Sequence, residues 1–488
     1  MMKKIKYLST LAMLLLLAAC QPDDKVEIII DTPIVVEDVM PAPELRGVWV
    51  ATTTNIDWPH GRFTEAEQKQ YYIDYLDKFV EANINAVFFQ IRPNADAFYN
   101  SPYESWSRWI TGTAGQDPGY DVLKFLIDEA HARNLEFHAW INPFRITTRA
   151  SGGTFPALDP KINPEWVRDY ATIRVYNPAL PEVHKRIVDI VDDIITKYDV
   201  DGIHMDDYFY PDIGSESLAD TAEFRIYGEG YANPTAFRID NVNKVIKAIH
   251  DVIVKRKPQV VFSISPTSSL SYNLGTLYAD VEKWYNEQWV DVLIPQIYSA
   301  IGTGAITATT SFYRLAIDWQ QNYATNAVLM VGHYLSRVGD GTSQSFTAQE
   351  IVEQYKIVRG FPKIKGSILF SAKCFFDNSG RGNLGVIELI KDEVYPTPAV
   401  RPFVGRKILP EPTPPANLVL NGTTLTWTQP ASGFYSVVYA IPAGKTTAQV
   451  ETITFGNTYK IPARGKYFVT TVNKQNVQSE VSAIVAYE

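Results

Sequence analysis

The sequence predicts a (β/α)₈ barrel followed by a small β-sandwich. Eight short apolar runs, most of them ending in polar residues, lie at fairly regular intervals between Arg46 and Phe375, with helical stretches between them. Strands that alternate with helices in this way are typical of a closed parallel barrel. After a proline-rich break the pattern changes to short alternating runs separated by turn residues, which is typical of an all-β sandwich.

The barrel is expected over residues 44–395. Its strands are predicted near 46–53, 86–92, 136–142, 200–207, 260–266, 290–298, 327–334 and 366–374. Helical stretches between them include 65–82, 122–133, 181–198 and 239–257, and Pro181 at a first turn is an ordinary helix start signal. The loops after the first four strands are long and rich in Trp, Tyr, Gly and Pro, so they are expected to build a substrate cleft.

The C-terminal part is expected to be a separate small domain. Residues 396–415, from Pro396 to Pro415, form the proline-rich break and are interpreted as a linker, and residues 416–488 as the sandwich. The run Leu425-x-Trp427-x-x-Pro430 and the later Tyr467-x-Val469 resemble a fibronectin type III domain. Such a domain would support or space the barrel.

The N-terminus has the pattern of a bacterial lipoprotein signal. Residues 1–19 combine a positive start with an apolar stretch, Leu11–Ala19, that is too short to span a bilayer. The stretch closes with Leu-Ala-Ala-Cys20, which resembles the lipobox in which the cysteine is lipidated. Residues 20–43 would then be a tether, and the protein would lie in the cell envelope, anchored to a membrane through Cys20. The sequence is compatible with the periplasmic face and with the cell surface.

Charge and motif content exclude several function classes. The formal net charge is -9, and removing Lys3, Lys4 and Lys6 with the signal takes it to -12. No long basic run occurs, so nucleic acid is not an expected partner. No Gly-x-Gly-x-x-Gly follows a strand, so no dinucleotide cofactor is expected. Cys374 is the only other cysteine, which excludes an intramolecular disulfide after lipidation.

The fourth predicted strand carries the strongest chemical signal, in the run Val200-Asp-Gly-Ile-His-Met-Asp-Asp-Tyr208. Alternate residues of a strand face the same way, so His204, Asp206 and Tyr208 share one face. The apolar residues between them suit the layer beneath the helices. Asp206 is therefore expected at the barrel mouth and Asp207 near its rim, where a carboxylate can attack a sugar C1, hold an oxocarbenium-like charge or orient a substrate group.

The other strands are expected to point polar side chains to the same end of the barrel. Amide, guanidinium, imidazole and aromatic groups together suit a carbohydrate site, because hydroxyls take directional hydrogen bonds and sugar rings stack on aromatic faces. Many buried polar groups at one end are hard to explain as packing. The residues are Gln90, Arg92, Asn94 and Asp96 from the second strand, His138, Trp140 and Asn142 from the third, Gln296 and Tyr298 from the sixth, His333 from the seventh, and Ser371 and Lys373 from the eighth.

Five ordered motifs resemble the glycosyl-hydrolase-like 10 family, over roughly residues 44–395. They are Glu44-Leu-Arg-Gly-Val-Trp-Val-Ala51 with Asn55-Ile-Asp-Trp-Pro59, Phe89-Gln-Ile-Arg-Pro93 with Asp96-Ala-Phe-Tyr99, His138-Ala-Trp-Ile-Asn-Pro143, Asp201-Gly-Ile-His-Met-Asp-Asp-Tyr-Phe-Tyr-Pro211 and Pro295-Gln-Ile-Tyr298. The resemblance implies a TIM-barrel glycoside hydrolase of a bacterial, often lipid-anchored kind. At least one branch of that family acts on peptidoglycan glycan strands stripped of peptide.

More distant resemblances single out Asp206. Gly202-Ile-His-Met-Asp206 is similar to the fourth-strand Gly-x-Arg-x-Asp of α-amylases, whose Asp is the nucleophile, and the same run resembles the Asp-Gly-x-Asp-x-Asp-x-Glu of chitinases. Both alignments keep Asp206 and leave the general acid open, because the fifth strand ends in Ser265-Pro-Thr without a carboxylate. The remaining candidates for the acid, in falling order, are Asp207, Asp96, Asp57 and Glu104.

The expected function is therefore a glycoside hydrolase that acts on a polysaccharide, with Asp206 as nucleophile or charge stabiliser and Asp207 or Asp96 as proton donor. The missing fifth-strand acid motivates a first alternative, a glycan-binding barrel without catalysis. The second alternative is a metal-dependent deacetylase in which His138, His204 and His333 meet Asp206. No metal site is predicted, since the chain has no His-Glu-x-x-His and no cysteine cluster.

Overall fold

Eight parallel strands close into a barrel, as the sequence predicts, in a computed structural model that describes residues 39–302, 310–376, 385–406, 408–430 and 435–487. Each strand pairs with its neighbours along the chain, and the last pairs with the first. The strands are β1 (Leu45–Val50), β2 (Ala86–Arg92), β3 (Glu136–Ile141), β7 (Gly202–Met205), β8 (Val261–Ile264), β9 (Val292–Leu293), β10 (Val328–His333) and β11 (Ile364–Phe370).

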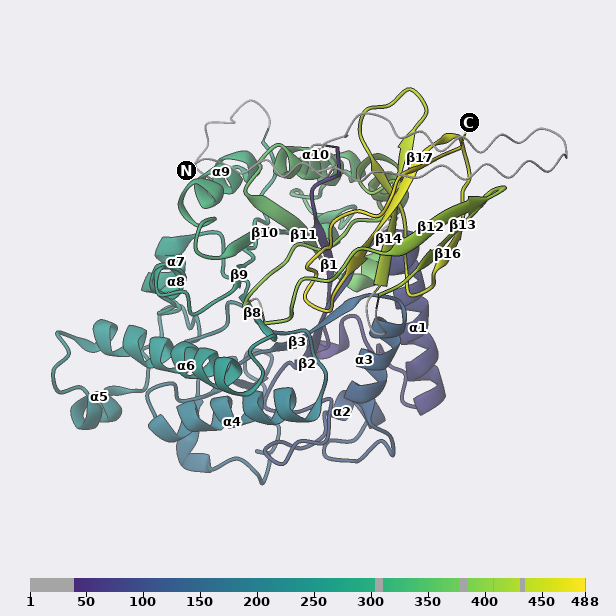
Figure 1. Cartoon of the computed structure of the whole chain (residues 1–488). Coiled ribbons are helices and arrows are strands. Elements are labelled where there is room, and N and C mark those ends of the chain that lie inside the picture. The colour runs from purple at the N-terminus through teal and green to yellow at the C-terminus, as the bar shows by residue number, and fades with distance from the viewer. Residues whose placement is uncertain (1–38, 303–309, 377–384, 407, 431–434, 488) are drawn as a thin grey trace, which may run out of the picture.

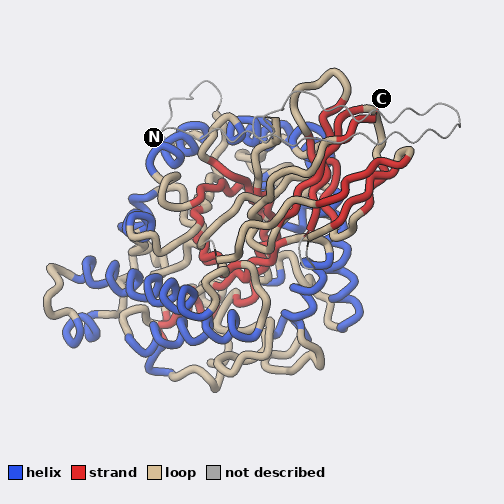
Figure 2. Tube along the Cα trace, in the orientation of Figure 1, coloured by secondary structure: helices blue, strands red, loops and turns tan. Residues whose placement is uncertain are grey.

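Helices surround the barrel and cover its outer face (Figure 2). The longer ones are α1 (Glu65–Glu81), α3 (Val122–Ala132), α4 (Pro181–Lys197), α6 (Pro234–Arg256), α9 (Phe312–Asn322) and α10 (Ala348–Arg359). Helix α1 begins with a capping box between Thr64 and Glu67, and α4 begins with Pro181, so local sequence fixes both starts. Shorter helices are α2 (Arg108–Thr111), α5 (Thr221–Tyr227), α7 (Leu270–Gly275), α8 (Val281–Asn286) and α11 (Val386–Leu389).

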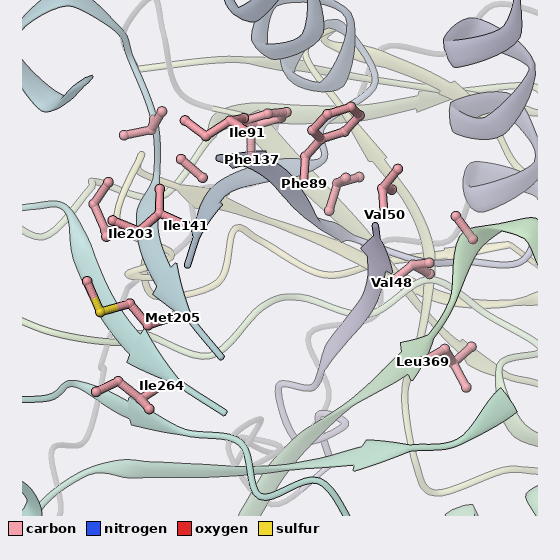
Figure 3. Close-up of a cluster of buried hydrophobic side chains, with 14 of the residues drawn as sticks. Val48, Val50, Phe89, Ile91, Phe137, Ile141, Ile203, Met205, Ile264 and Leu369 are labelled. Carbon is pink, nitrogen blue, oxygen red and sulfur yellow. The ribbon is translucent and has the colours of Figure 1, made fainter. Parts of the chain in front are cut away.

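Alternation along the strands separates two layers of side chains. Aliphatic and aromatic residues at every second position, such as Val48, Phe89, Ile141 and Met205, are buried in the large core between barrel and helices (Figure 3). The intervening positions fill the barrel interior, where the apolar cluster includes Trp49, Phe88 and Met330. Polar residues of this inner face therefore lie inside the barrel or at its C-terminal mouth.

Long loops build up the C-terminal end of the barrel. After β3 the chain forms a three-stranded antiparallel sheet in the order β4 (Arg145–Thr148), β6 (Ile173–Tyr176), β5 (Val167–Asp169), before α4 begins. Its first strand starts four residues after the end of β3, so its earliest side chains lie beside the barrel mouth.

The C-terminal residues form two small antiparallel sheets. One has the order β12 (Ala416–Asn421), β13 (Thr424–Thr428), β16 (Thr458–Lys460), and the other the order β15 (Gln449–Thr454), β14 (Tyr435–Pro442), β17 (Gly465–Val472), β18 (Val485–Tyr487). Leu425 and Trp427 of the first sheet share a buried cluster with Val438 and Val469 of the second. The two sheets therefore pack face to face around a core of their own.

The sandwich lies at the N-terminal end of the barrel strands, opposite the mouth (Figure 1). The segment predicted as a linker runs across this end: Glu44 N donates to the Val400 carbonyl at 2.9 Å. Arg401 is buried and forms an ion pair with Glu136 at the start of β3, with 3.2 Å between Nε and Oε1. The sandwich thus packs on the N-terminal end of the barrel, and the loops alone surround the C-terminal mouth. Among the described helices, none has the length and apolar character needed to cross a membrane.

Candidate active site

Asp206 follows β7 directly and is held by three N–H donors. Trp140 Nε1 donates to its Oδ2 at 3.0 Å, Asn142 Nδ2 donates to its Oδ1 at 3.0 Å, and the Tyr208 backbone N–H donates to Oδ1 at 3.2 Å. Burial raises the pKa of the carboxyl, and the charge of Arg145 and the three hydrogen bonds oppose that rise. Only 3% of Asp206 is exposed, so its position and orientation are fixed by the protein.

Asp207, the next residue, accepts a hydrogen bond from only one side-chain donor in the described part of the chain. Its Oδ1 accepts from Gln296 Nε2 at 3.1 Å, and Gln296 Nε2 also donates to the Ser265 carbonyl at 2.9 Å. Burial and, second, the negative charge of Asp206 raise the pKa of Asp207 to about 6. The two adjacent carboxyls therefore have different environments: three N–H donors favour the ionised form of Asp206, whereas the negative charge of Asp206 favours the protonated form of Asp207.

Arg145 is a site residue that the sequence reasoning missed. It begins β4, its backbone N–H donates to Asn142 Oδ1 at 2.9 Å, and its Nε and Nη2 both donate to the Pro93 carbonyl. The guanidinium lies 4.7 Å from the ring centroid of Tyr208 and opposes the pKa rise of both Asp206 and Asp207. Its place three residues after Asn142, behind a strand end rich in polar groups, is the signal that would have found it.

Aromatic side chains stand around the carboxyl pair. Tyr208 is 49% exposed and carries Arg145 on its ring face. Tyr298 stacks on Tyr334 with 4.6 Å between ring centroids, and Phe370 lies 6.1 Å from Tyr298. Burial raises the pKa of Tyr298, and the negative charges of Asp207 and Asp206 add to that rise. Exposed and half-exposed rings of this kind are suited to stacking on sugar faces.

His204 lies one layer below the mouth, where it supports the site without reaching it. Trp49 Nε1 donates to His204 Nε2 at 3.0 Å, so Nδ1 carries the hydrogen and donates to Ser263 Oγ at 2.8 Å. Complete burial lowers the pKa of His204 well below its usual value, and the ring is neutral. The expectation that His204 contacts substrate is corrected, because both of its nitrogens are already bonded inside the barrel.

The two other imidazoles are also placed differently from the sequence-based expectation. His138 lies near the barrel floor, where it stacks on Phe88 with 4.3 Å between ring centroids. It also packs so close to Gly202 that a Cβ added at that position would lie 2.2 Å from His138 Nδ1. His333 faces the helices, since it bonds Gln354 of α10 and Ser367 at 3.0 Å each. The three imidazoles do not meet at Asp206, and among the described residues no group of three or more His, Cys, Asp or Glu side chains is placed to hold a metal ion.

Arg92 is a structural residue, although the sequence analysis assigned it to substrate. It is fully buried and its Nε and Nη2 bond the two carboxylate oxygens of Glu104 at 2.7 and 2.5 Å. Its Nη1 also donates to the Asn142 carbonyl. A shift in the β2–β3 register between Gln90 and Arg92 turns the side chain away from the simple alternation. Both carboxylate oxygens of Glu104, the fourth candidate for the general acid, are bonded to Arg92.

Asp96 and Asn94 belong to the same neighbourhood as Arg92. Burial raises the pKa of Asp96 to about 6; the Ser107 hydroxyl bonds it, and Glu104 and Arg92 are its charged neighbours. Asn94 pairs with Asp96 through an isolated β-bridge. The structure therefore groups Asp96 with the Arg92–Glu104 pair, which leaves Asp207 as the carboxyl beside Asp206.

Three more of the sequence-predicted residues shape the rim. Gln90 Oε1 accepts from the backbone N–H groups of Thr52 and Thr53 at 3.1 and 2.9 Å, and its buried Nε2 has no partner in the described part of the chain. Asp57 is fully buried and accepts from Ala51 N, Ser371 Oγ and Lys373 N. Asp57 thus ties the end of β1 to the end of β11, and Lys373 joins the site through its backbone.

Residues 44–346 match the family described as Glycosyl hydrolase-like 10. The chain is 37% identical over 382 residues to Glycosyl hydrolase YngK of Bacillus subtilis (strain 168), which covers 74% of this chain and 73% of that protein. It is 30% identical over 366 residues to Glycosyl hydrolase DigH of Escherichia coli (strain K12), covering 67% and 82%. Among solved structures, the PgaB (BpsB) glycoside hydrolase domain from Bordetella bronchiseptica is 12% identical with a TM-score of 0.46, covering 72% of this chain and 99% of that one.

Proposed function

Because the chain belongs to the glycosyl hydrolase-like 10 family, we propose that it hydrolyses O-glycosidic bonds of a polysaccharide at the pair Asp206 and Asp207. The observation that carries this proposal is the contrast between the two adjacent carboxyls. Three N–H donors support Asp206 as an anion, whereas burial and the charge of Asp206 raise the pKa of Asp207 to about 6. One stabiliser and one acid are the two groups that glycoside hydrolysis needs.

Asp206 would stabilise the positive charge that develops on the sugar ring as the bond breaks. Its two oxygens are fixed by Trp140, Asn142 and the Tyr208 N–H, so the carboxylate is preorganised and needs no rearrangement during the reaction. The same geometry serves three uses: attack on C1, electrostatic stabilisation, or orientation of an N-acetyl group of the substrate that itself attacks C1. In each use Asp206 acts ionised.

Asp207 would donate its proton to the leaving glycosidic oxygen. A general acid must be protonated at the working pH, and a pKa of about 6 meets this need in mildly acidic solution. Gln296 Nε2, anchored on the Ser265 carbonyl, would hold the carboxyl toward the mouth.

The pH profile tests this role. Asp207 is protonated below its folded pKa, so kcat/KM should fall as pH rises through about 6. The Asp207→Asn variant should lose this alkaline limb together with most of the activity toward unactivated glycans. An unchanged alkaline limb in Asp207→Asn would assign the proton to another group.

For the substrate we propose peptidoglycan glycan strands stripped of peptide, on the strength of the family resemblance. Lipidation at Cys20 would place the enzyme in the cell envelope, where that polymer lies, and a fibronectin type III-like sandwich would act as its support. The test is to incubate the mature protein with peptide-free glycan strands, chitin oligosaccharides and α-glucans, and to follow new reducing ends. Products from the glycan strands alone would support this substrate, and products from another polymer would replace it.

A glycan-binding barrel without catalysis is the second candidate. The observation that favours it is the end of β8, where Ser265 and the residues after it supply no carboxylate opposite Asp206. A glycan-binding barrel would bind oligosaccharides but release no new reducing ends from glycan strands, chitin oligosaccharides or α-glucans. A deacetylase that uses His138, His204 and His333 draws no support from the geometry, since these rings are bonded in three separate places.

A further inference from the structure

Arg145 contacts the ends of three neighbouring barrel strands around Asp206. Its Nε and Nη2 donate to the carbonyl of Pro93, the residue after β2, at 3.0 and 2.8 Å. Its backbone N–H donates to Asn142, the residue after β3, at 2.9 Å, and its guanidinium lies 4.7 Å from the ring centroid of Tyr208, beyond the end of β7. The strands β2, β3 and β7 are adjacent in the barrel, so Arg145 joins their ends on the side of the mouth where Asp206 lies.

The backbone N–H of Arg145 fixes the orientation of the Asn142 amide. Oδ1 of Asn142 accepts from a group that can only donate, so Nδ2 is the end that faces Asp206, to which it donates at 3.0 Å. A reversed amide would set its oxygen against the Asp206 carboxylate and lose both hydrogen bonds. Asn142 is therefore a donor to Asp206 because β4 begins where it does.

The side chain of Arg145 acts on the second donor of the same carboxylate oxygen. Tyr208 donates its backbone N–H to Asp206 Oδ1 at 3.2 Å, while its ring is half exposed and has the Arg145 guanidinium over one face. A cation over an aromatic face is attracted by the ring quadrupole. Arg145 therefore restrains the loop that carries this N–H donor.

The charge of Arg145 acts on both carboxyls of the pair. Arg145 is buried, and its Nε and Nη2 bond a neutral carbonyl rather than a carboxylate. Solvent screens the field of a buried cation only weakly. Burial raises the pKa of Asp206 and the charge of Arg145 lowers it. Burial and the charge of Asp206 raise the pKa of Asp207, which Arg145 also lowers.

The other titratable groups around the pair stay uncharged between about pH 4 and about pH 8. His204 of β7 lies below the mouth, where Trp49 and Ser263 bond its two nitrogens and burial lowers its pKa. Burial raises the pKa values of three tyrosines: Tyr208 after β7, Tyr272 of α7 and Tyr298 after β9. The charges that decide the ionisation of the pair are therefore those of the two carboxyls and Arg145.

We propose that Arg145 is a positioning residue for the reaction at Asp206: it holds the two donors of Oδ1 in place and keeps the carboxylate ionised. This inference rests on the proposed function for the reaction, and it adds a group that controls both carboxyls without touching the substrate. Because the charge of Arg145 acts on both, it sets the pH range in which Asp206 is ionised while Asp207 still carries its proton.

Two variants separate the charge of Arg145 from its packing. Arg145→Gln removes the charge but keeps an N–H donor for the Pro93 carbonyl, and Arg145→Lys keeps the charge. Without the charge the pKa values of Asp206 and Asp207 both rise, so both limbs of the kcat/KM profile should move to higher pH in Arg145→Gln. Arg145→Lys should leave both limbs in place.

A slower Arg145→Gln with unmoved limbs would reduce Arg145 to a structural residue. Limbs that move in Arg145→Lys as they do in Arg145→Gln would remove the role of the charge. If Arg145→Gln does not fold, Arg145→Lys decides by itself: limbs in place support the proposal, and displaced limbs overturn it.

A stability cycle tests the same coupling without a substrate. Urea unfolding of the wild type, Arg145→Gln, Asp206→Asn and the double variant gives the coupling free energy between the two residues. The folded pKa of Asp206 lies above its ordinary value, so ionising this carboxyl costs stability as pH rises, and Arg145 reduces that cost. The coupling should therefore be present at about pH 8 and shrink toward about pH 4.

The matched control is Arg256→Gln on α6, because Arg256 is exposed and paired with Asp192 at the outer surface. Its cycle with Asp206→Asn should give no coupling at either pH. A coupling between Arg145 and Asp206 that is absent, or equal at both pH values, would overturn the proposal. A pH-dependent coupling in a protein that hydrolyses none of the glycan strands, chitin oligosaccharides or α-glucans would uphold the positioning role and defeat the proposed hydrolase.

Discussion

Asp206→Asn is expected to lower kcat on the polysaccharide substrate by about a thousandfold, with glycan binding retained. The asparagine oxygen can still accept one of the hydrogen bonds from Trp140 and Asn142, so the mouth keeps its shape. The substitution removes the negative charge next to the sugar ring. That charge stabilises the transition state and not the bound substrate, because positive charge develops on the ring only as the bond breaks. Initial rates of reducing-end formation at saturating substrate, with binding measured by calorimetry, give both quantities.

Asp128→Asn is the matched control, because Asp128 is an exposed carboxylate of α3 that is paired only with Lys124. It should leave both rate and affinity unchanged. An Asp206→Asn variant with wild-type kcat would remove Asp206 from the chemistry, and one that loses binding and rate together would show a role in holding the substrate.

Glu104→Gln is expected to cost about 3–5 kcal/mol in the free energy of unfolding of the barrel. The side chains of Arg92 and Glu104 are both fully buried, and the substitution leaves the Arg92 charge without its partner. Because Arg92 also bonds the Asn142 carbonyl, the strand end that carries Asn142 would lose support. Urea denaturation followed by tryptophan fluorescence measures the change.

An exposed ion pair provides the comparison. Breaking the Lys124–Asp128 pair, in which both side chains are more than half exposed, should change stability by about 0.5 kcal/mol or less. A similarly small effect of Glu104→Gln would mean that Arg92 finds another partner or that water reaches it, and would reopen a role for Arg92 at the substrate.

The barrel was predictable from the sequence because its signal repeats eight times and each strand carries the alternation. The same alternation placed Asp206, Trp140 and Asn142 correctly on the inner face. The alternation does not tell how far along the barrel axis a side chain lies from the mouth. His138 and His204 share that face but lie below the mouth, where they pack on Phe88 and accept from Trp49.

Local breaks of the pattern explain the other differences. The register shift before Arg92 redirects its side chain toward Glu104, a partner twelve residues away that no strand period reveals. His333 lies one residue out of step with the inward positions of β10, since Met330 belongs to the interior cluster and His333 bonds α10. Arg145 begins β4, a strand outside the barrel, so the pattern of the eight barrel strands does not predict it.

The most direct test of the central claim is hydrolysis of the identified polysaccharide in ¹⁸O-labelled water, with the products and any released acetate analysed by mass spectrometry. The account predicts that each new reducing end carries one ¹⁸O, that no acetate appears, and that Asp206→Asn and Asp207→Asn both suppress the labelled product. Labelled acetate without chain cleavage, or tight binding with no labelled product from any polymer, would contradict it.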